Sequence, residues 1–535
     1  MLDELLHGLG PDDDRPALLA TRRTGRTVVA ATRADLGHLA TGYAAALHAR
    51  GLVAGDTVGL AVRPGPRSMA VLLAAYSLGL RIAVLDPTAG PDVLLARLAL
   101  AAPKLVLADA AAQAVAGWAA PLARRARLAL PDLAAIAPTV TVGRRLPGTA
   151  PALLPANGSA PVFDGDGDAV IVFTSGTTSR PRAVVHTRAS LAAGMRAVAG
   201  LVRPAPERAV LGGTFFVLIP ALAGGAPVAL PARRPGTLAR QVARLSPQAT
   251  YLTPPQLRAA LAAGVPFTGR VYSGSAPVSA GLLAAVRRAG AHEAWGVYAL
   301  TEVFPAAAVE SSAKNAFDGT GDLVGELLPG IEARTDESGQ LLLAGPNAAD
   351  RYLGEEPLSW VATGDIGRVD GRTVVLGGRC KDMILRGAEN IYPGLYEPAL
   401  HVNGVELAVI VGVPAGDGDE RVVAIVQPAA GASAAAVRAA LREPLQRMGA
   451  ARPDEVLIAE VPLTGRSRKP DREALRAVLA SVAPGLRPRQ RPQGAQSPRA
   501  GGNAGQHSAR RRRARVQRAG VDRRGVAGAR RANRP

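Results

Sequence analysis

Short apolar runs alternate with segments of helical period from about residue 15 to residue 365. Leu238, Val242 and Leu245 follow the three- and four-residue spacing of a helix that buries one face. Uninterrupted apolar runs of four or five residues indicate buried strands instead. Three such runs are residues 82–85, 169–173 and 227–230. This alternation predicts an α/β fold in which mainly parallel sheets are covered by helices.

A smaller version of this pattern begins after about residue 378. Two apolar segments, residues 409–413 and 422–426, predict paired strands joined by a turn. A helical pattern then runs from residue 434 to about residue 446. This order of elements is typical of a small α+β domain, and a length of about 100 residues is within the usual range for a domain.

The changes of pattern divide the chain into three parts. We expect a large N-terminal domain over residues 1–378 and a small C-terminal domain over residues 379–482. Residues 483–535 have no apolar periodicity and consist largely of Arg, Gly, Gln, Pro and Ala. Because such a composition cannot bury enough apolar surface to offset chain entropy, we predict a disordered, Arg-rich tail.

Residues 209–232 require a test for a membrane span, since they carry no charge and are long enough to cross a bilayer. Three prolines and four glycines interrupt them. Pro220, Gly224 and Pro227 in close succession favour a strand, a turn and a second buried strand over a spanning helix. We therefore expect no membrane span.

The net charge of +20 is concentrated at one end of the chain. Residues 487–535 hold 15 Arg and one acid and so carry +14, which leaves +6 for all the residues before them. This tail has no aromatic side chains on which bases could stack. Nucleic-acid binding is therefore expected only as non-specific phosphate contact through the tail.

Composition sets further limits. With 48% hydrophobic and 20% charged residues, the chain is typical of a globular protein. Cys380 is the single cysteine, which excludes an intrachain disulfide and a multi-thiolate metal site. Residues 1–14 are acidic and lack a basic and then apolar leader, so we expect a cytoplasmic protein.

The strongest local signal is VIVFTSGTTSRPR at residues 170–182. A buried strand runs directly into six residues rich in hydroxyl and backbone amide groups. Such a loop can surround an anion, because these groups donate hydrogen bonds to phosphate oxygens. The spacing of a P-loop is absent, and a surface turn after a strand is the alternative interpretation.

Further motifs follow in order along the chain. They are YALTE at 298–302, TGD at 363–365, GGRCKDMILRGAENIYP at 377–393, and the pair Arg468 and Lys469. Together with the loop and with residues 85–87 and 273–277, they resemble the adenylate-forming superfamily of AMP-dependent synthetases and ligases. This superfamily includes acyl-CoA and aryl-CoA synthetases, adenylation domains of peptide synthetases, and luciferases. The resemblance covers roughly residues 15–482.

The resemblance implies an ATP site. Tyr298 would offer a flat face to adenine, Asp365 would accept both ribose hydroxyls, and Arg379 would reach the ribose. Ser275 belongs to the motif at 273–277 and is included with these nucleotide-binding residues. Glu302 would bind a magnesium ion that bridges the phosphates, because this hard cation prefers oxygen ligands. The phosphates themselves would contact Thr174, Ser175, Gly176, Thr177, Thr178 and Arg182.

The same resemblance implies roles in catalysis. Lys469 would place an ammonium between the acid and the α-phosphate, where negative charge concentrates in the transition state. Thr301 would contact the α-phosphate or the acyl carboxylate, beside Glu302. Lys381 matches the hinge about which the mobile small domain of this family rotates between an adenylating and a thioester-forming pose, and Gly387 matches a thiol-side position. For Lys469 and Glu302 the alternative is a plain surface side chain.

Several positions depart from the family pattern. Ser179, Arg182 and Ala183 replace Gly, Lys and Gly in the loop. Ala299 and Arg468 replace two further glycines, and a lost glycine matters where φ was positive or where ATP approaches the backbone. Residues 214–220, TFFVLIP, lie where the acid pocket usually begins and imply an apolar pocket.

The expected function is therefore ATP-dependent activation of a carboxylic acid to an acyl-adenylate, with release of pyrophosphate and transfer to a thiol. Coenzyme A is the expected acceptor. The alternatives are loading of the phosphopantetheine of an acyl carrier protein, β-lactone synthesis, and a non-catalytic nucleotide-binding relative. The sequence identifies neither the acid nor the oligomeric state.

Overall fold

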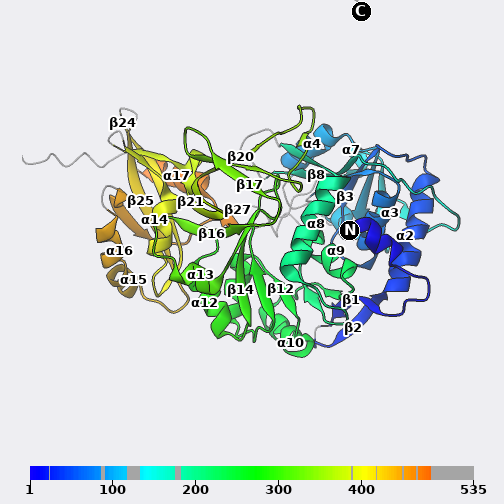
Figure 1. The fold of residues 1–535 in the computed structure, drawn as a ribbon, viewed down its shortest axis with the longest axis horizontal. Helices are drawn as coiled ribbons and strands as arrows, with labels where there is room; N and C mark the ends of the chain where they lie inside the picture. The colour runs from blue at the N-terminus through cyan, green and yellow to red at the C-terminus, as the bar shows by residue number, and fades with distance from the viewer. Residues whose placement is uncertain are drawn as a thin grey trace, which may run out of the picture. The chain divides into compact units, whose positions relative to one another are not determined.

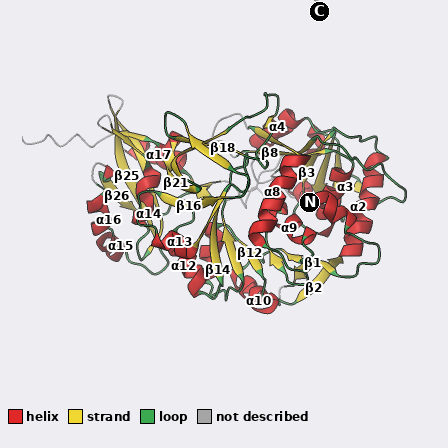
Figure 2. Ribbon diagram, viewed as in Figure 1, coloured by secondary structure: helices red, strands yellow, loops and turns green. Residues whose placement is uncertain are grey.

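The computed structural model describes residues 1–22, 24–85, 91–116, 133–174, 182–386, 389–416, 419–448, 451–464 and 468–482. The first of the two units into which the chain divides is Met1–Pro484. The predicted tail, residues 483–535, lies outside the described residues. Figures 1 and 2 show the first unit as large sheets with helices packed against them.

An eight-stranded sheet lies in the N-terminal part. Its order is β19 (Arg351–Tyr352), β9 (Ala183–Thr187), β8 (Asp168–Phe173), β4 (Arg81–Val84), β3 (Thr57–Ala61), β5 (Leu105–Asp109), β6 (Thr139–Val142) and β7 (Ala152–Leu153). Neighbours from β8 to β7 are parallel, and β9 and β19 add an antiparallel edge. The runs predicted at 82–85 and 169–173 correspond to β4 and β8, since an uninterrupted apolar run suits a strand that is buried on both faces.

A thirteen-stranded sheet follows. Its order is β17 (Glu332–Thr335), β18 (Gln340–Ala344), β20 (Val361–Asp370), β21 (Thr373–Arg379), β16 (Asp322–Leu327), β15 (Ala307–Glu310), β14 (Glu293–Tyr298), β13 (Arg270–Ser273), β12 (Ala249–Tyr251), β10 (Val210–Leu211), β11 (Val228–Ala229), β1 (Pro16–Thr21) and β2 (Thr27–Thr32). Neighbours from β1 to β14 are parallel, whereas β2 and the strands from β15 to β17 are antiparallel. The mainly parallel arrangement predicted for the large domain therefore does not extend beyond residue 298. The short connections after β14 join antiparallel strands, because a parallel pair needs a crossover of a dozen or more residues.

Helices cover both sheets, which confirms the predicted α/β class. The eight-stranded sheet packs on α2, α3 and α8 through one apolar cluster and on α4 and α7 through another. The thirteen-stranded sheet packs on α9 and, separately, on α10, α11 and α12. The helices are α1 (Leu2–His7), α2 (Arg33–His48), α3 (Pro66–Ser77), α4 (Pro91–Ala101), α5 (Ala110–Ala116), α7 (Leu133–Ile136), α8 (Arg188–Val202), α9 (Phe215–Ala223), α10 (Pro235–Leu245), α11 (Pro254–Ala262), α12 (Ala280–Arg288) and α13 (Ser311–Ala316).

The segment at 209–232 differs from its prediction in the middle. Strands β10 and β11 lie near its ends, but the residues between them include helix α9, with Pro220 inside it. Val217, Leu218, Ile219, Ala221 and Leu222 are all buried. Burial of so many apolar side chains outweighs the helix-breaking tendency of proline. Within the described residues, no helix is both long enough and apolar enough to cross a membrane.

The C-terminal elements have a core of their own. Val411 of β24 lies opposite Val423 of β25, as predicted, and the predicted helix from residue 434 is two helices. The two apolar clusters here contain only residues 384–479. The domain boundary after residue 378 stays a prediction. The elements are η1 (Cys380–Asp382), β22 (Ile384–Arg386), β23 (Glu389–Ile391), α14 (Pro393–Leu400), β24 (Val405–Gly416), β25 (Asp419–Pro428), α15 (Ala434–Ala440), α16 (Arg442–Arg447), β26 (Glu455–Ile458), β27 (Leu463–Thr464), β28 (Lys469–Pro470) and α17 (Arg472–Val482).

Candidate active site

Three of the predicted nucleotide-binding residues meet at one buried carboxylate. The side chain of Asp365 accepts a hydrogen bond of 2.6 Å at Oδ2 from the Tyr298 hydroxyl. Its Oδ1 accepts a second hydrogen bond, of 2.9 Å, from Arg379 Nε. The strand register explains this meeting, because Asp365 on β20 lies opposite Arg379 on β21.

The TGD segment within β20 orients the carboxylate of Asp365, which is only 3% exposed. Gly364 has a φ of +71°, which disfavours a side chain, and Asp365 N donates to Thr363 Oγ1 at 3.0 Å. Burial first, and then the charge of Asp365, raise the pKa of Tyr298 well above its ordinary value, so the phenol stays protonated and donates. Each Asp365 oxygen keeps a further lone pair, which fits two ribose hydroxyls.

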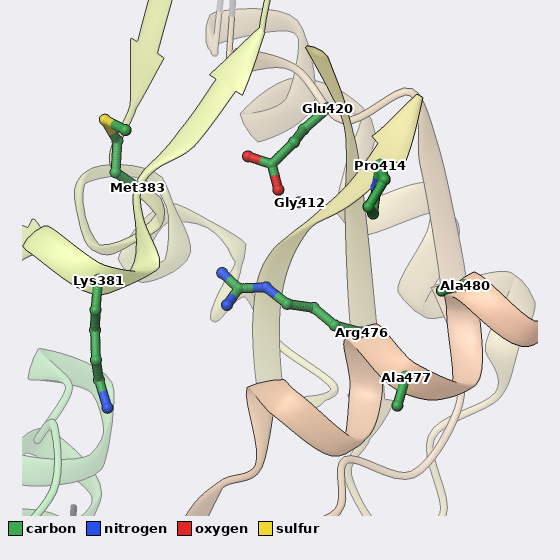
Figure 3. Close-up of a pocket in the computed structure, with 8 residues that line it drawn as sticks. All are labelled: Lys381, Met383, Gly412, Pro414, Glu420, Arg476, Ala477 and Ala480. Atoms are coloured by element: carbon green, nitrogen blue, oxygen red, sulfur yellow. The ribbon is translucent and has the colours of Figure 1, made fainter. Parts of the chain in front are cut away.

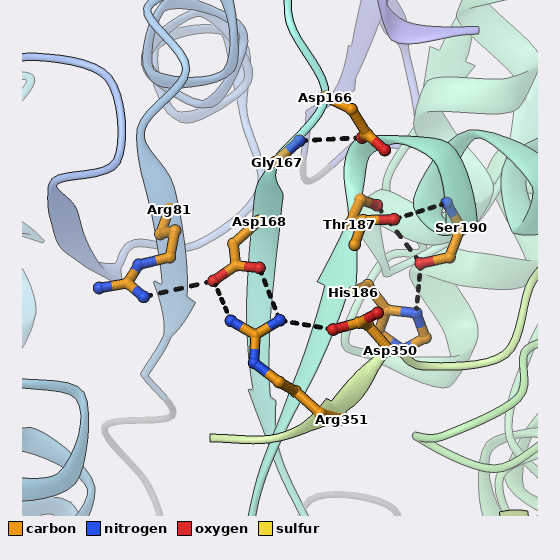
Figure 4. Close-up of polar contacts among 9 residues, drawn as sticks. All are labelled: Arg81, Asp166, Gly167, Asp168, His186, Thr187, Ser190, Asp350 and Arg351. Atoms are coloured by element: carbon orange, nitrogen blue, oxygen red, sulfur yellow. Dashed lines mark hydrogen bonds and ion pairs between the residues drawn. The ribbon is translucent and has the colours of Figure 1, made fainter. Parts of the chain in front are cut away.

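A buried histidine holds the segment that carries Thr301 and Glu302. His186 on β9 is 0% exposed, and its Nε2 lies 2.8 Å from the Thr301 carbonyl oxygen. Burial lowers the pKa of His186, so the ring is neutral and Nε2 carries the proton that this carbonyl accepts. Nδ1 then accepts from Ser190 Oγ at 3.4 Å (Figure 4). From the other side, Ala349 N donates to the backbone oxygen of Glu302 at 2.7 Å.

The Glu302 carboxylate contacts a tyrosine that lies beside the phosphate loop. The Tyr352 hydroxyl donates to Glu302 Oε1 at 3.1 Å, and the guanidinium carbon of Arg182 lies 3.9 Å from the centre of the Tyr352 ring. The ends of the loop also meet, since Thr174 N donates to Arg182 O at 3.0 Å. The predicted loop residues between them, Ser175, Gly176, Thr177 and Thr178, lie outside the described residues.

Lys469 lies among the same charges, at the start of β28. Burial lowers the pKa of Lys469, and the positive charges of Arg379 and Lys381 lower it further. The negative charges of Asp365 and Glu302 act in the opposite direction. The Lys469 ammonium therefore stands within electrostatic reach of both predicted site carboxylates.

Arg472 fixes the segment that follows Lys469. Its guanidinium contacts both Glu397 carboxylate oxygens, at 2.7 and 2.8 Å, and contacts Asp382 Oδ2 at 3.1 Å. It also donates to Ile410 O at 2.7 Å. These partners lie on α14, η1 and β24. Contacts with three elements therefore fix Arg472, which lies three residues after Lys469.

Ser275 contacts a different tyrosine. Its Oγ lies 2.8 Å from the Tyr251 hydroxyl, and its φ is +68°. The preceding Gly274 packs its backbone on β14, since a Cβ added there would lie 2.8 Å from Val297 O. The segment that carries Ser275 is thereby held next to the end of β14, where Tyr298 lies.

The predicted hinge residue borders a cavity of about 440 Å³. Figure 3 shows the guanidinium of Arg476 extending from α17 into this space. The lining residues are Lys381, Met383, Gly412, Pro414, Glu420, Arg476, Ala477 and Ala480. Gly387, predicted on the thiol side, lies outside the described residues.

The replaced glycines have different consequences. Neither Ala183 nor Ala299 has a positive φ, so the backbone conformation does not require glycine at these two positions. Arg468 has a φ of +50°, in the left-handed region that disfavours a side chain. Arg468 therefore keeps the backbone conformation that suits the family's glycine, and this conformation is strained for arginine. Ser179 lies outside the described residues.

Sequence reasoning missed Tyr352, His186 and Tyr251. Strand pairing places Tyr352 opposite Val184, two residues after Arg182. That register depends on a contact between distant segments, so no local pattern indicated it. His186 has a weak signal, as a polar residue within an apolar strand, and Tyr251 has none beyond its place at the end of β12.

The described residues contain no group of three or more His, Cys, Asp or Glu side chains that could hold a metal ion. A metal ion at Glu302 would take its remaining ligands from phosphate oxygens and water, which is common for magnesium. Glu302 Oε1 is hydrogen-bonded by Tyr352, and no donor within the described residues contacts Oε2. The single carboxylate therefore fits magnesium bound jointly by protein and nucleotide.

Comparison with known proteins places these residues in context. Residues 11–353 match the family described as AMP-binding enzyme. Feruloyl-CoA synthase from Amycolatopsis sp is 30% identical to this chain over a match that covers 49% of this chain and 60% of that protein. Olefin beta-lactone synthetase from Stenotrophomonas maltophilia is 29% identical over 70% of this chain and 76% of its own length. The structure of amide bond synthetase McbA from Marinactinospora thermotolerans shares the fold, with a TM-score of 0.71 and 23% identity over 89% of this chain and 99% of that chain.

Proposed function

Because the chain belongs to the AMP-binding enzyme family, we propose that it uses ATP to activate a carboxylic acid as an acyl-adenylate and then transfers the acyl group to a thiol. Coenzyme A is the proposed acceptor. The observation that carries this proposal is the hydrogen bonding of Tyr298 and Arg379 to Asp365. The half-buried Lys469 ammonium lies within reach of the charges of Asp365 and Glu302.

In the first half-reaction, an oxygen of the acid attacks the α-phosphorus of ATP, and the bond to the departing pyrophosphate breaks. Both reactants are anionic, so the Lys469 ammonium stabilises the charge that develops between them. Its partial burial strengthens this effect, because water screens charges less away from the surface. Asp365 and Tyr298 would hold the ribose and adenine, and Thr301 would orient the acid or the α-phosphate. When bound at Glu302, magnesium neutralises charge on the phosphates.

In the second half-reaction, a thiol sulfur attacks the acyl carbon and AMP leaves. Similarity to a feruloyl-CoA synthase supports coenzyme A as the thiol. The proposed hinge at Lys381 would carry Lys469 away and bring the thiol side, near Gly387, to the acyl-adenylate. The phosphopantetheine of a carrier protein offers the same thiol chemistry and is the alternative acceptor.

A second candidate is β-lactone formation, in which a hydroxyl group of the activated acid itself displaces AMP. The similarity to olefin beta-lactone synthetase favours this candidate, since it extends over 70% of the chain. The two candidates share the first half-reaction and differ only in the nucleophile of the second.

Acid-dependent exchange between ATP and pyrophosphate tests the first half-reaction. With a panel of fatty and aryl acids, we expect one class of acid to support exchange and Lys469→Ala to lower it by about 100-fold or more. Lys104→Ala is the matched control, because Lys104 is exposed and pairs with Asp56. No exchange with any acid, despite ATP binding, would contradict the proposal and favour a non-catalytic relative. Loss of free coenzyme A thiol then separates thioester formation from lactone formation.

A further inference from the structure

Tyr352 connects two groups that the proposed function assigns to the ATP phosphates. Its hydroxyl donates to Glu302 Oε1 at 3.1 Å, while its ring lies 3.9 Å from the guanidinium carbon of Arg182. Glu302 is the proposed magnesium ligand, and Arg182 replaces the lysine of the phosphate loop. A single buried side chain, 8% exposed, thus contacts both.

The strand segment that carries Tyr352 is held by its neighbours, and the side chain packs with Val184, Ala349 and Leu358. Strand β19 pairs with β9, and Leu353 N donates to Ala183 O at 2.8 Å. The neighbouring Arg351 donates to both oxygens of Asp168, at 3.0 and 2.7 Å, as Figure 4 shows. Paired hydrogen bonds of this kind fix orientation as well as distance. Tyr352 therefore presents its ring and hydroxyl from a rigid support.

The two contacts act on different properties of the site. The hydroxyl orients Glu302 and occupies Oε1, which directs Oε2 toward a metal ion. A phenol is protonated at neutral pH, so the Tyr352 hydroxyl donates to Glu302 Oε1. The ring supports Arg182 through a cation–π contact, which a planar guanidinium makes well.

We propose that Tyr352 is a positioning residue that sets Glu302 for magnesium through its hydroxyl and sets Arg182 for the triphosphate through its ring. This inference rests on the proposed function. It explains how arginine replaces the usual lysine at residue 182, because the Arg182 guanidinium lies over the Tyr352 ring.

Binding of α,β-methylene-ATP, measured by calorimetry, tests the two roles without knowledge of the acid. Titrations in EDTA report the metal-free affinity, and titrations at increasing magnesium report the gain from the metal ion. For Tyr352→Phe we expect a metal-free affinity within about twofold of the wild type. The increase in affinity that magnesium gives should be about fivefold smaller, because one hydrogen bond to a charged group is lost. For Tyr352→Leu we expect both quantities to fall, since Arg182 loses its support.

Two further variants complete the experiment. Tyr272→Phe is the matched control, because it removes a buried hydroxyl that donates to Leu201 O at 2.8 Å and contacts neither Glu302 nor Arg182. It should match the wild type in both titrations. Arg182→Gln should weaken the metal-free affinity about threefold or more and leave the gain from magnesium unchanged, which isolates the role of the ring even where Tyr352→Leu is unstable.

The outcomes separate this inference from the proposed function. If the wild-type chain does not bind the analogue with or without magnesium, the proposed function fails. If the wild type binds and Tyr352→Phe shows the same gain from magnesium, the role of the hydroxyl is overturned while the function stands. If Arg182→Gln and Tyr352→Leu both keep the wild-type metal-free affinity, the role of the ring is overturned.

Discussion

Arg468 occupies a backbone conformation that suits glycine, one residue before the proposed catalytic lysine. A non-glycine residue in the left-handed region destabilises the folded chain by about 1–2 kcal/mol. Glycine removes this strain, but its greater conformational freedom in the unfolded chain offsets part of the gain. We expect Arg468→Gly to raise the free energy of unfolding by about 1 kcal/mol relative to Arg468→Ala, in urea titrations at pH 7. An Arg468→Gly variant less stable than Arg468→Ala would show that the strain is absent.

Lys469 itself should destabilise the folded chain at neutral pH. Its pKa is lowered by burial first and then by Arg379 and Lys381. Between that lowered value and the ordinary value of 10.5, the unfolded chain binds the proton more readily than the folded chain. The contribution of Lys469 to stability therefore rises as pH increases through this window.

The corresponding variant is Lys469→Met, which keeps the length of the side chain and removes its charge. We expect it to increase the free energy of unfolding at pH 7, with a gain that shrinks as the pH approaches 10.5. Denaturant titrations at several pH values measure this. Lys104→Met, at an exposed position, supplies the baseline. A Lys469→Met variant with reduced stability at pH 7 would refute the argument.

At the scale of elements, β9 supports the site through His186. Replacing this side chain with an apolar one leaves the half-buried Thr301 carbonyl without its donor, at a cost of about 1–3 kcal/mol. We expect His186→Leu to lower the free energy of unfolding by that amount and to weaken magnesium-dependent binding of the ATP analogue, since Glu302 follows Thr301. His186→Gln retains an N–H donor and should recover part of both losses. Equal effects of the two variants would exclude a role for the hydrogen bond.

The elements that sequence predicted are those with a local signal. Strands β4 and β8 are buried on both faces and read as uninterrupted apolar runs, and the β24 and β25 pair follows from two such runs joined by a turn. Helix α9 was not predicted, because Pro220 argues locally against a helix and only packing in the core favours it. The antiparallel strands after β14 were also missed, since strand direction is set by connections and not by apolar pattern.

The site residues also divide into those with a local sequence signal and those without one. Motifs identified Tyr298, Asp365 and Arg379, and the structure brings these three together at hydrogen-bonding distance. Tyr352 and His186 reach the site only through the pairing of β9 with its neighbours. No local pattern marks Tyr352, and His186 has only the weak signal of a polar residue within an apolar strand. Local chemistry was thus readable from sequence, whereas the side chains that support it depend on long-range register.

At the scale of the whole molecule, charge and catalysis are separated along the chain. The proposed site uses residues from 174 to 469, whereas residues 487–535 carry +14 of the net charge of +20. Each phosphate that such a tail neutralises on duplex DNA lowers the slope of log affinity against log salt by about 0.9. Any nucleic-acid binding should therefore be steeply salt-dependent and independent of base sequence.

Truncation after Arg487 tests this separation. We expect the full chain to bind a mixed-sequence DNA duplex at low salt, and to bind heparin, which lacks bases, in the same way. The truncated chain should lose both interactions because it loses 14 of the tail's 15 arginines. Its affinity for α,β-methylene-ATP should remain within about twofold of the full chain, since the ATP site would involve none of the removed residues. DNA binding that survives truncation would place a nucleic-acid site on the catalytic body, and an altered ATP affinity would connect the tail to the site.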